Sequence, residues 1–245
     1  MRVTGIGTGL FIEGESLIDF ISKNIVNVEE GAIIAITSKI VALSQGRVCG
    51  IRDKEMFLRQ ESKEIIETPW EPLTLTNDGW CINAGMDESN ADSRIILMPG
   101  HSFEVAENIR SVLRDFFSID RRGIIITDTK SVPLRVGTIG RAIGYAGFEP
   151  LKSYIGRKDL FDRKSRVTES NVADALAAAA VLMMGEGDER VPLAIIDDAP
   201  VSFVSGPVER KTLSLLPEND IFSYVFARVK KEVPRRLRRD TVSGR

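Results

Sequence analysis

The sequence predicts a protein of the α+β class with mixed sheets, and three observations support this prediction. Apolar positions recur with helical spacing in several segments, and short runs rich in β-branched residues lie between them. The two kinds of segment alternate without a strict strand-helix-strand repeat, so antiparallel pairing stays open. With 43% hydrophobic and 28% charged residues, the 245-residue chain has the composition of a globular protein with a substantial core.

Strands are predicted from short apolar runs at residues 31–37, 80–84, 124–127 and 191–196. Two of these runs lead to an acid, since Asp87 follows the second run and Asp128 directly follows the third. A glycine-rich stretch at residues 137–147 is spaced too irregularly for a dinucleotide-binding fingerprint. We interpret that stretch as closely packed backbone.

Helices are predicted over residues 15–24, 53–67, 101–117 and 169–184. Thr168 is a candidate N-cap for the last helix, which has an alanine-rich centre. Small side chains in that centre indicate tight packing against a neighbouring element.

Composition excludes several classes of site. No apolar run approaches the roughly 20 residues that span a bilayer, and the first residues lack the apolar core of a signal peptide, so we expect a cytoplasmic protein without a membrane partner. The chain has only two cysteines, Cys49 and Cys81, and one histidine, His101, which argues against a zinc site built from these residue types. Any metal must therefore be held by oxygen.

The net charge of −2 is unevenly distributed. Residues 228–245 hold eight Lys and Arg against Glu232 and Asp240, which leaves −8 on the rest of the chain. We expect residues 1–215 to form one module of one domain or two interlocked lobes, and residues 216–245 to form an extension with a basic tail. A solvated tail is the favoured interpretation, and contact with RNA or an acidic partner is the less favoured alternative.

The acids that follow the predicted strands have polar neighbours, in the segments 85–90 and 127–130. Ligand sites of α/β folds lie at such strand ends. Carboxylate and hydroxyl oxygens suit Mg²⁺ or Mn²⁺, which in turn bridge nucleotide phosphates. The alternative from spacing alone is a pair of polar turns.

Several motifs occur in a fixed order within residues 1–198. They are Thr37-Ser38-Lys39-Ile40-Val41 with Gly46-Arg47, Cys81-Ile82-Asn83-Ala84-Gly85-Met86-Asp87-Glu88-Ser89-Asn90, Ile126-Thr127-Asp128-Thr129 with Pro133 and Arg135, Ala142-Ile143-Gly144-Tyr145-Ala146-Gly147 with Pro150-Leu151, and Arg166-Val167-Thr168-Glu169 leading into Ala173-Asp174-Ala175-Leu176-Ala177. In this order they resemble the coenzyme F420 gamma-glutamyl ligase family.

The resemblance implies a two-lobed fold, a homodimer, and a ligase that uses GTP with Mg²⁺ or Mn²⁺. Such a ligase joins L-glutamate to the carboxylate of a small-molecule acceptor through an acyl phosphate. Carried over to matching positions, the resemblance implies that Asp87, Asp128 and Thr129 bind metal. The two-pronged guanidinium of Arg135 is suited to a phosphate or carboxylate, so we expect Arg135 to act in catalysis. The positions that the resemblance implies for the nucleotide are Thr8, Gly9, Leu10, Phe11, Ser38 and Asn90, and Lys39 is a further candidate because of its charge.

The sequence departs from the family pattern at three places. Leu43 stands where family members commonly have a lysine that reaches the nucleotide, and Lys39 or Lys130 would have to supply that charge. Residues 76–79 replace a usual His-Gly pair, and residues 130–132 replace a common Phe-Gly-Arg. The acceptor could therefore be F420-like or folate-like, and a catalytically altered nucleotide-binding homologue with a regulatory role is the alternative.

Overall fold

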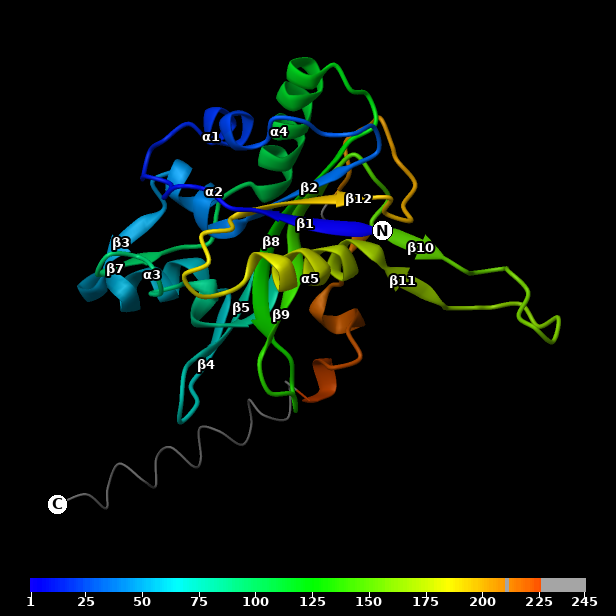
Figure 1. Cartoon of the computed structure of the whole chain (residues 1–245). Helices are drawn as coiled ribbons and strands as arrows, with labels where there is room; N and C mark the ends of the chain where they lie inside the picture. Colours follow the sequence, from blue (N-terminus) through cyan, green and yellow to red (C-terminus); the bar gives the residue numbers. More distant parts are fainter. Residues whose placement is uncertain (210–211, 226–245) are drawn as a thin grey trace.

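The computed structural model describes residues 1–209 and 212–225, and it has a central sheet with helices on both faces (Figure 1). The five strands of this sheet lie in the order β1-β12-β2-β8-β9. Their bounds are Arg2–Ile6 for β1, Ile33–Thr37 for β2, Gly123–Ser131 for β8, Thr138–Ala146 for β9 and Leu193–Asp197 for β12. Only β2 and β8 pair in parallel, so the sheet is mixed and the predicted α+β class is confirmed.

Alternating side chains of the central strands enter two apolar cores. Ile34 and Ile36 of β2 pack on the face covered by α1 (Leu17–Asn24) and α4 (Ser102–Phe117), whereas Ile33 and Ala35 face α5 (Val172–Met184). A strand with apolar residues on both faces must be covered on both faces. The continuous apolar run at residues 31–37 therefore correctly predicted a buried strand.

The glycine-rich stretch forms strand β9, which the sequence did not predict as a strand. Its backbone lies against helices on both faces, as the predicted close packing requires. A Cβ added at Gly140 would lie 2.7 Å from the Ala177 carbonyl oxygen of α5, and one at Gly144 would lie 2.5 Å from the Ser102 carbonyl oxygen of α4. Glycine lets these helices approach the sheet more closely than any side chain allows.

The chain between α2 (Ser38–Ser44) and α4 forms two smaller sheets. Strands β3 and β7 pair with each other, and β4, β5 and β6 form a three-stranded antiparallel sheet. The bounds are Val48–Gly50 for β3, Glu64–Ile66 for β4, Leu73–Thr76 for β5, Gly79–Ile82 for β6 and Arg94–Ile96 for β7. A tight turn at residues 76–79 joins β5 to β6 and carries one of the departures from the family pattern.

Two predicted helix boundaries were wrong, and one helix was missed. The helix expected over residues 53–67 is α3 (Lys54–Glu61) and ends early, because residues 64–66 pair with β5. The last helix begins at Val172 with Asn171 as its N-cap instead of Thr168, because residues 169–171 form β11. Helix α2 was missed, since seven residues are too few for a clear helical period.

A two-stranded arm extends away from the body of the molecule (Figure 1). It consists of β10 (Leu151–Ser153), β11 (Glu169–Asn171) and the chain between them. Leu160 and Phe161 near its end are 97% and 79% exposed.

The other architectural predictions are only partly addressed by the described residues. The whole basic tail, residues 228–245, lies outside them. The module boundary at residue 215 and the two-lobed arrangement stay predictions. Within residues 1–209 and 212–225, no helix is long and apolar enough to cross a membrane.

Candidate functional site

The segments that carry the predicted site lie at one edge of the central sheet, where β1 and β2 end and β12 begins. The parallel pair β2 and β8 places Thr37 beside Thr127, so the residues that follow them in the chain meet at this edge. Strand β12 runs antiparallel to β1 and β2, and its first residue, Leu193, pairs with Ile6 at the end of β1. The topology therefore brings together the chain after β1, after β2 and before β12.

A cavity of about 360 Å³ lies at this edge. Ten of the eleven residues predicted for the site line it, namely Thr8, Gly9, Leu10, Phe11, Ser38, Lys39, Asp87, Asn90, Asp128 and Thr129. The fold thus brings together predicted residues that are spread over some 120 positions of sequence. Their individual roles remain predictions.

Asp128 is held from both carboxylate oxygens. Its Oδ2 accepts hydrogen bonds from Arg141 Nη2 at 3.0 Å and Arg141 Nε at 3.3 Å, and its Oδ1 accepts from Ser38 Oγ at 3.4 Å. Burial raises the pKa of the Asp128 carboxyl above its ordinary value, and the Arg141 guanidinium opposes this shift. The acid lies inside β8, beyond an irregularity after Ile126, and not at the strand end that the sequence predicted.

Asp87 and Lys39 also line this cavity and contact each other. The Lys39 Nζ lies 2.9 Å from Asp87 Oδ2 and donates to the Ser89 carbonyl oxygen at 3.1 Å. Burial of Asp87 opposes its ionisation, but the hydrogen bond and charge of Lys39, together with the hydrogen bonds from Ser89, outweigh burial and lower the pKa of this carboxyl. Asp87 and Lys39 therefore form a partly buried ion pair at the cavity wall.

The loop between α5 and β12 lines the cavity, and sequence reasoning missed it. Glu186 Oε2 accepts a hydrogen bond from Thr129 Oγ1 at 3.4 Å, and the Gly187 carbonyl accepts one from Asn90 Nδ2 at 3.0 Å. Burial raises the pKa of Glu186, against the hydrogen bond from Thr129. The acidic run at residues 186–189, placed between a helix and a strand, was the available signal.

The donor set suits a hard cation in its chemistry. Asp87, Asp128 and Glu186 offer carboxylate oxygens, and Thr129 offers a hydroxyl, which are the ligand types of Mg²⁺ and Mn²⁺. Among the described residues, however, no three His, Cys, Asp or Glu side chains form a group that could hold a metal ion. Lys39 and Arg141 supply the positive charge beside the two aspartates.

Arg135 is the one predicted site residue that the structure places elsewhere. It lies in the turn between β8 and β9, is exposed, and lines neither of the cavities described. Lys130 also lines neither cavity, whereas Leu43 lines the smaller one. Of the two lysines considered as a substitute for the missing charge at Leu43, only Lys39 therefore reaches the cavity.

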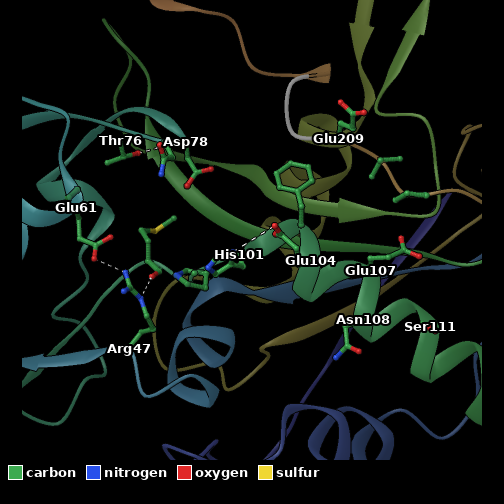
Figure 2. A pocket seen from close by; sticks show the side chains of 18 residues that line it. Arg47, Glu61, Thr76, Asp78, His101, Glu104, Glu107, Asn108, Ser111 and Glu209 are labelled. Carbon is green, nitrogen blue, oxygen red and sulfur yellow. Dashed lines mark hydrogen bonds and ion pairs between the residues drawn. The ribbon is translucent and has the colours of Figure 1, made fainter.

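A second cavity of about 970 Å³ lies between the turn at residues 76–79 and α4 (Figure 2). Figure 2 shows Thr76 and Asp78 on one wall and Glu104 and Glu107 along α4 on another. Arg47, which pairs with Glu61 at 2.8 Å, also lines it, as do polar side chains farther along α4. Arg141 donates through Nη1 to the Asp78 carbonyl at 2.9 Å, so one guanidinium contacts residues that line both cavities.

Comparisons with known proteins show which family the chain belongs to. The family model described as F420-0:Gamma-glutamyl ligase matches residues 52–198. The coenzyme F420:L-glutamate ligase of Archaeoglobus fulgidus is 33% identical over 211 residues, covering 78% of this chain and 84% of that protein. Those of Methanococcus maripaludis and Methanocaldococcus jannaschii are 35% and 33% identical, covering 87% and 91% of this chain and 84% and 96% of the respective proteins.

Proposed function

Because the chain belongs to the F420-0:gamma-glutamyl ligase family, we propose that it is a GTP- and divalent-metal-dependent gamma-glutamyl ligase. It forms an amide between L-glutamate and a carboxylate of an F420-like or folate-like acceptor. The observation that carries the proposal is the cavity at the sheet edge, which unites Asp87, Asp128, Lys39 and Asn90 from separate segments.

The proposed reaction has two steps. In the first, an acceptor carboxylate oxygen attacks the γ-phosphorus of GTP, which gives an acyl phosphate and releases GDP. In the second, the glutamate amine attacks the acyl carbon, phosphate leaves, and the amine loses a proton as the amide forms. Both steps depend chiefly on positioning the reacting groups and on offsetting phosphate charge.

The side chains of the cavity meet these needs in different ways. Lys39 lies on the first turn of α2 and offers a cation for the phosphates, while Asn90 and Ser38 offer an amide and a hydroxyl. Asp87, Asp128 and Thr129 would hold the divalent ion, with Glu186 as a further carboxylate beside Thr129. When bound, such an ion neutralises phosphate charge and orients the transferred group.

A direct test incubates the full-length protein with GTP, Mn²⁺, labelled glutamate and a panel of deazaflavin and folate acceptors. We expect a product heavier by one glutamyl unit, formed together with GDP, and mass spectrometry detects both. GTP hydrolysis that is indifferent to glutamate and to every acceptor, with no amide product, would contradict the ligase proposal.

Lys39 should take over the role of the lysine that is missing at Leu43. Both residues line the cavity and lie four positions apart on α2, and therefore on the same helix face. We expect Lys39→Met to raise the KM for GTP by about tenfold, the equivalent of about 1.4 kcal/mol of a charge-assisted contact. Steady-state kinetics measure this, and Lys130→Met is the matched control that should change nothing. Equal effects of the two variants would show that Lys39 has no special role.

We also propose that the chain is a homodimer that forms through its arm. An arm of two short strands cannot bury Leu160 and Phe161 by itself. Because the family resemblance implies a homodimer, a second copy of the chain is the partner that we propose for these two side chains. Phe161→Glu should shift the mass measured by light scattering from dimer to monomer. Val26→Glu alters a residue that is 87% exposed and lies outside the arm, and it should leave the dimer intact. A Phe161→Glu variant of dimer mass would exclude the arm as the interface.

The alternative is a catalytically altered homologue that binds the nucleotide in a regulatory role. Leu43 favours it, since leucine brings no charge to the cavity. Calorimetry separates the two proposals: GTP binding with Mn²⁺ but without amide formation would favour the regulatory role.

A further inference from the structure

The Arg141 side chain is a buried cation in a strand whose other residues are uncharged. It lies in β9, and the residue is 5% exposed. A buried guanidinium is stable only when its N–H groups and its charge have partners. Here the partners come from two different segments, since Asp128 Oδ2 accepts from Nε and Nη2 while the Asp78 carbonyl accepts from Nη1.

These contacts join the walls of the two cavities. Asp128 lines the smaller cavity, and Asp78 lines the larger one as part of the turn at residues 76–79. The guanidinium is planar and rigid, so its position relative to Asp128 and its position relative to Asp78 change together. Ser38 holds the other oxygen of Asp128, so the carboxylate cannot rotate without breaking one of these contacts.

We propose that Arg141 is a positioning residue of the ligase: it orients the Asp128 carboxylate and ties it to the turn at residues 76–79, so that this turn helps to set the geometry of the smaller cavity. The effect on turnover rests on the proposed function, whereas the tie between the two segments does not. Partners behind a metal-binding carboxylate commonly change metal affinity or activity by about 10- to 100-fold when they are removed.

Two variants of the full-length chain separate the two contacts. Arg141→Ala removes both of them. Arg141→Lys keeps a charge beside Asp128, but a compact ammonium lacks the fork that reaches both Asp128 and the Asp78 carbonyl. Arg121→Ala is the matched control, because Arg121 also pairs with a carboxylate, Glu30 at 3.0 Å, but is largely exposed.

Hydrogen exchange followed by mass spectrometry tests the tie without reference to activity. We expect faster exchange in the peptide that covers residues 76–79 for both Arg141 variants and unchanged exchange there for Arg121→Ala. If Arg141→Ala does not fold, Arg141→Lys alone decides, and wild-type exchange at residues 76–79 in that variant would overturn the tie.

Turnover and Mn²⁺ binding test the positioning role. Arg141→Ala should lower kcat by about 10- to 100-fold and weaken Mn²⁺ binding, measured by electron paramagnetic resonance, by about tenfold, with little change in the KM for GTP. Millimolar guanidinium should restore part of the Arg141→Ala activity and none of the activity lost in other variants. Wild-type kcat and Mn²⁺ affinity in Arg141→Ala would refute the positioning role.

The tie and the ligase proposal can fail separately. If the wild-type protein makes no amide product but the Arg141 variants still exchange faster at residues 76–79, the ligase proposal is refuted and the tie stands.

Discussion

Asp128→Asn is expected to lower the rate of amide formation by about 1000-fold, because an amide can no longer supply the negative charge that a divalent ion requires. A bound ion stabilises phosphoryl transfer by several kcal/mol, and each 1.4 kcal/mol corresponds to a factor of about ten in rate. The substitution also leaves the buried Arg141 guanidinium without its counter-charge. We therefore expect a loss of stability of about 3 kcal/mol beside the loss of activity.

Two measurements distinguish these effects. The amide product is quantified by mass spectrometry, and calorimetry reports Mn²⁺ binding at a temperature at which the variant is folded. Asp197→Asn is the matched control, since Asp197 is also an ion-paired aspartate of the central sheet, with Arg2 at 3.0 Å, but lies outside the cavity. An Asp128→Asn protein that binds Mn²⁺ and turns over like the wild type would remove Asp128 from the site.

The sequence predicted those parts of the fold whose signal is local. Apolar runs such as residues 31–37 identify strands because burial on both faces requires such a run. The helical spacing of the apolar positions in residues 101–117 identifies α4. The end of α3 was predicted wrongly because Glu64, Ile65 and Ile66 suit a charged helix as well as a strand. Their pairing with residues 73–75 decides the outcome, and that pairing is not visible locally.

The site residues also divide into those with a local sequence signal and those without one. Asp87 and Asp128 were noticeable because each acid follows an apolar run, and the family resemblance supplied their proposed roles. Arg141 and Glu186 were missed because their importance arises from contacts with residues 13 and 57 positions away. Arg141 is the one charged residue of strand β9, and this was the one local sign that it has a buried partner.

Gly147→Ala is expected to be the most destabilising single-methyl change in the glycine-rich segment, by about 4 kcal/mol. Gly147 has a φ of 84°, where an L-residue costs about 1–2 kcal/mol. An added Cβ would also lie 2.1 Å from the Arg122 carbonyl oxygen and 2.5 Å from Arg110 Nε, which donates to that oxygen at 3.2 Å. Both arginines are buried, so separating them leaves polar groups without partners and adds about 1–3 kcal/mol.

Gly137→Ala isolates the backbone contribution to this effect. Gly137 has a φ of 88°, close to that of Gly147, but a Cβ there meets no atom within 4 Å. We expect Gly137→Ala to cost about 1 kcal/mol, since only the backbone conformation is penalised. Urea denaturation of both variants gives the two free energies of unfolding. The difference between them measures how tightly the end of β9 packs on the Arg110–Arg122 contact, and equal values would mean that this packing adds nothing to stability.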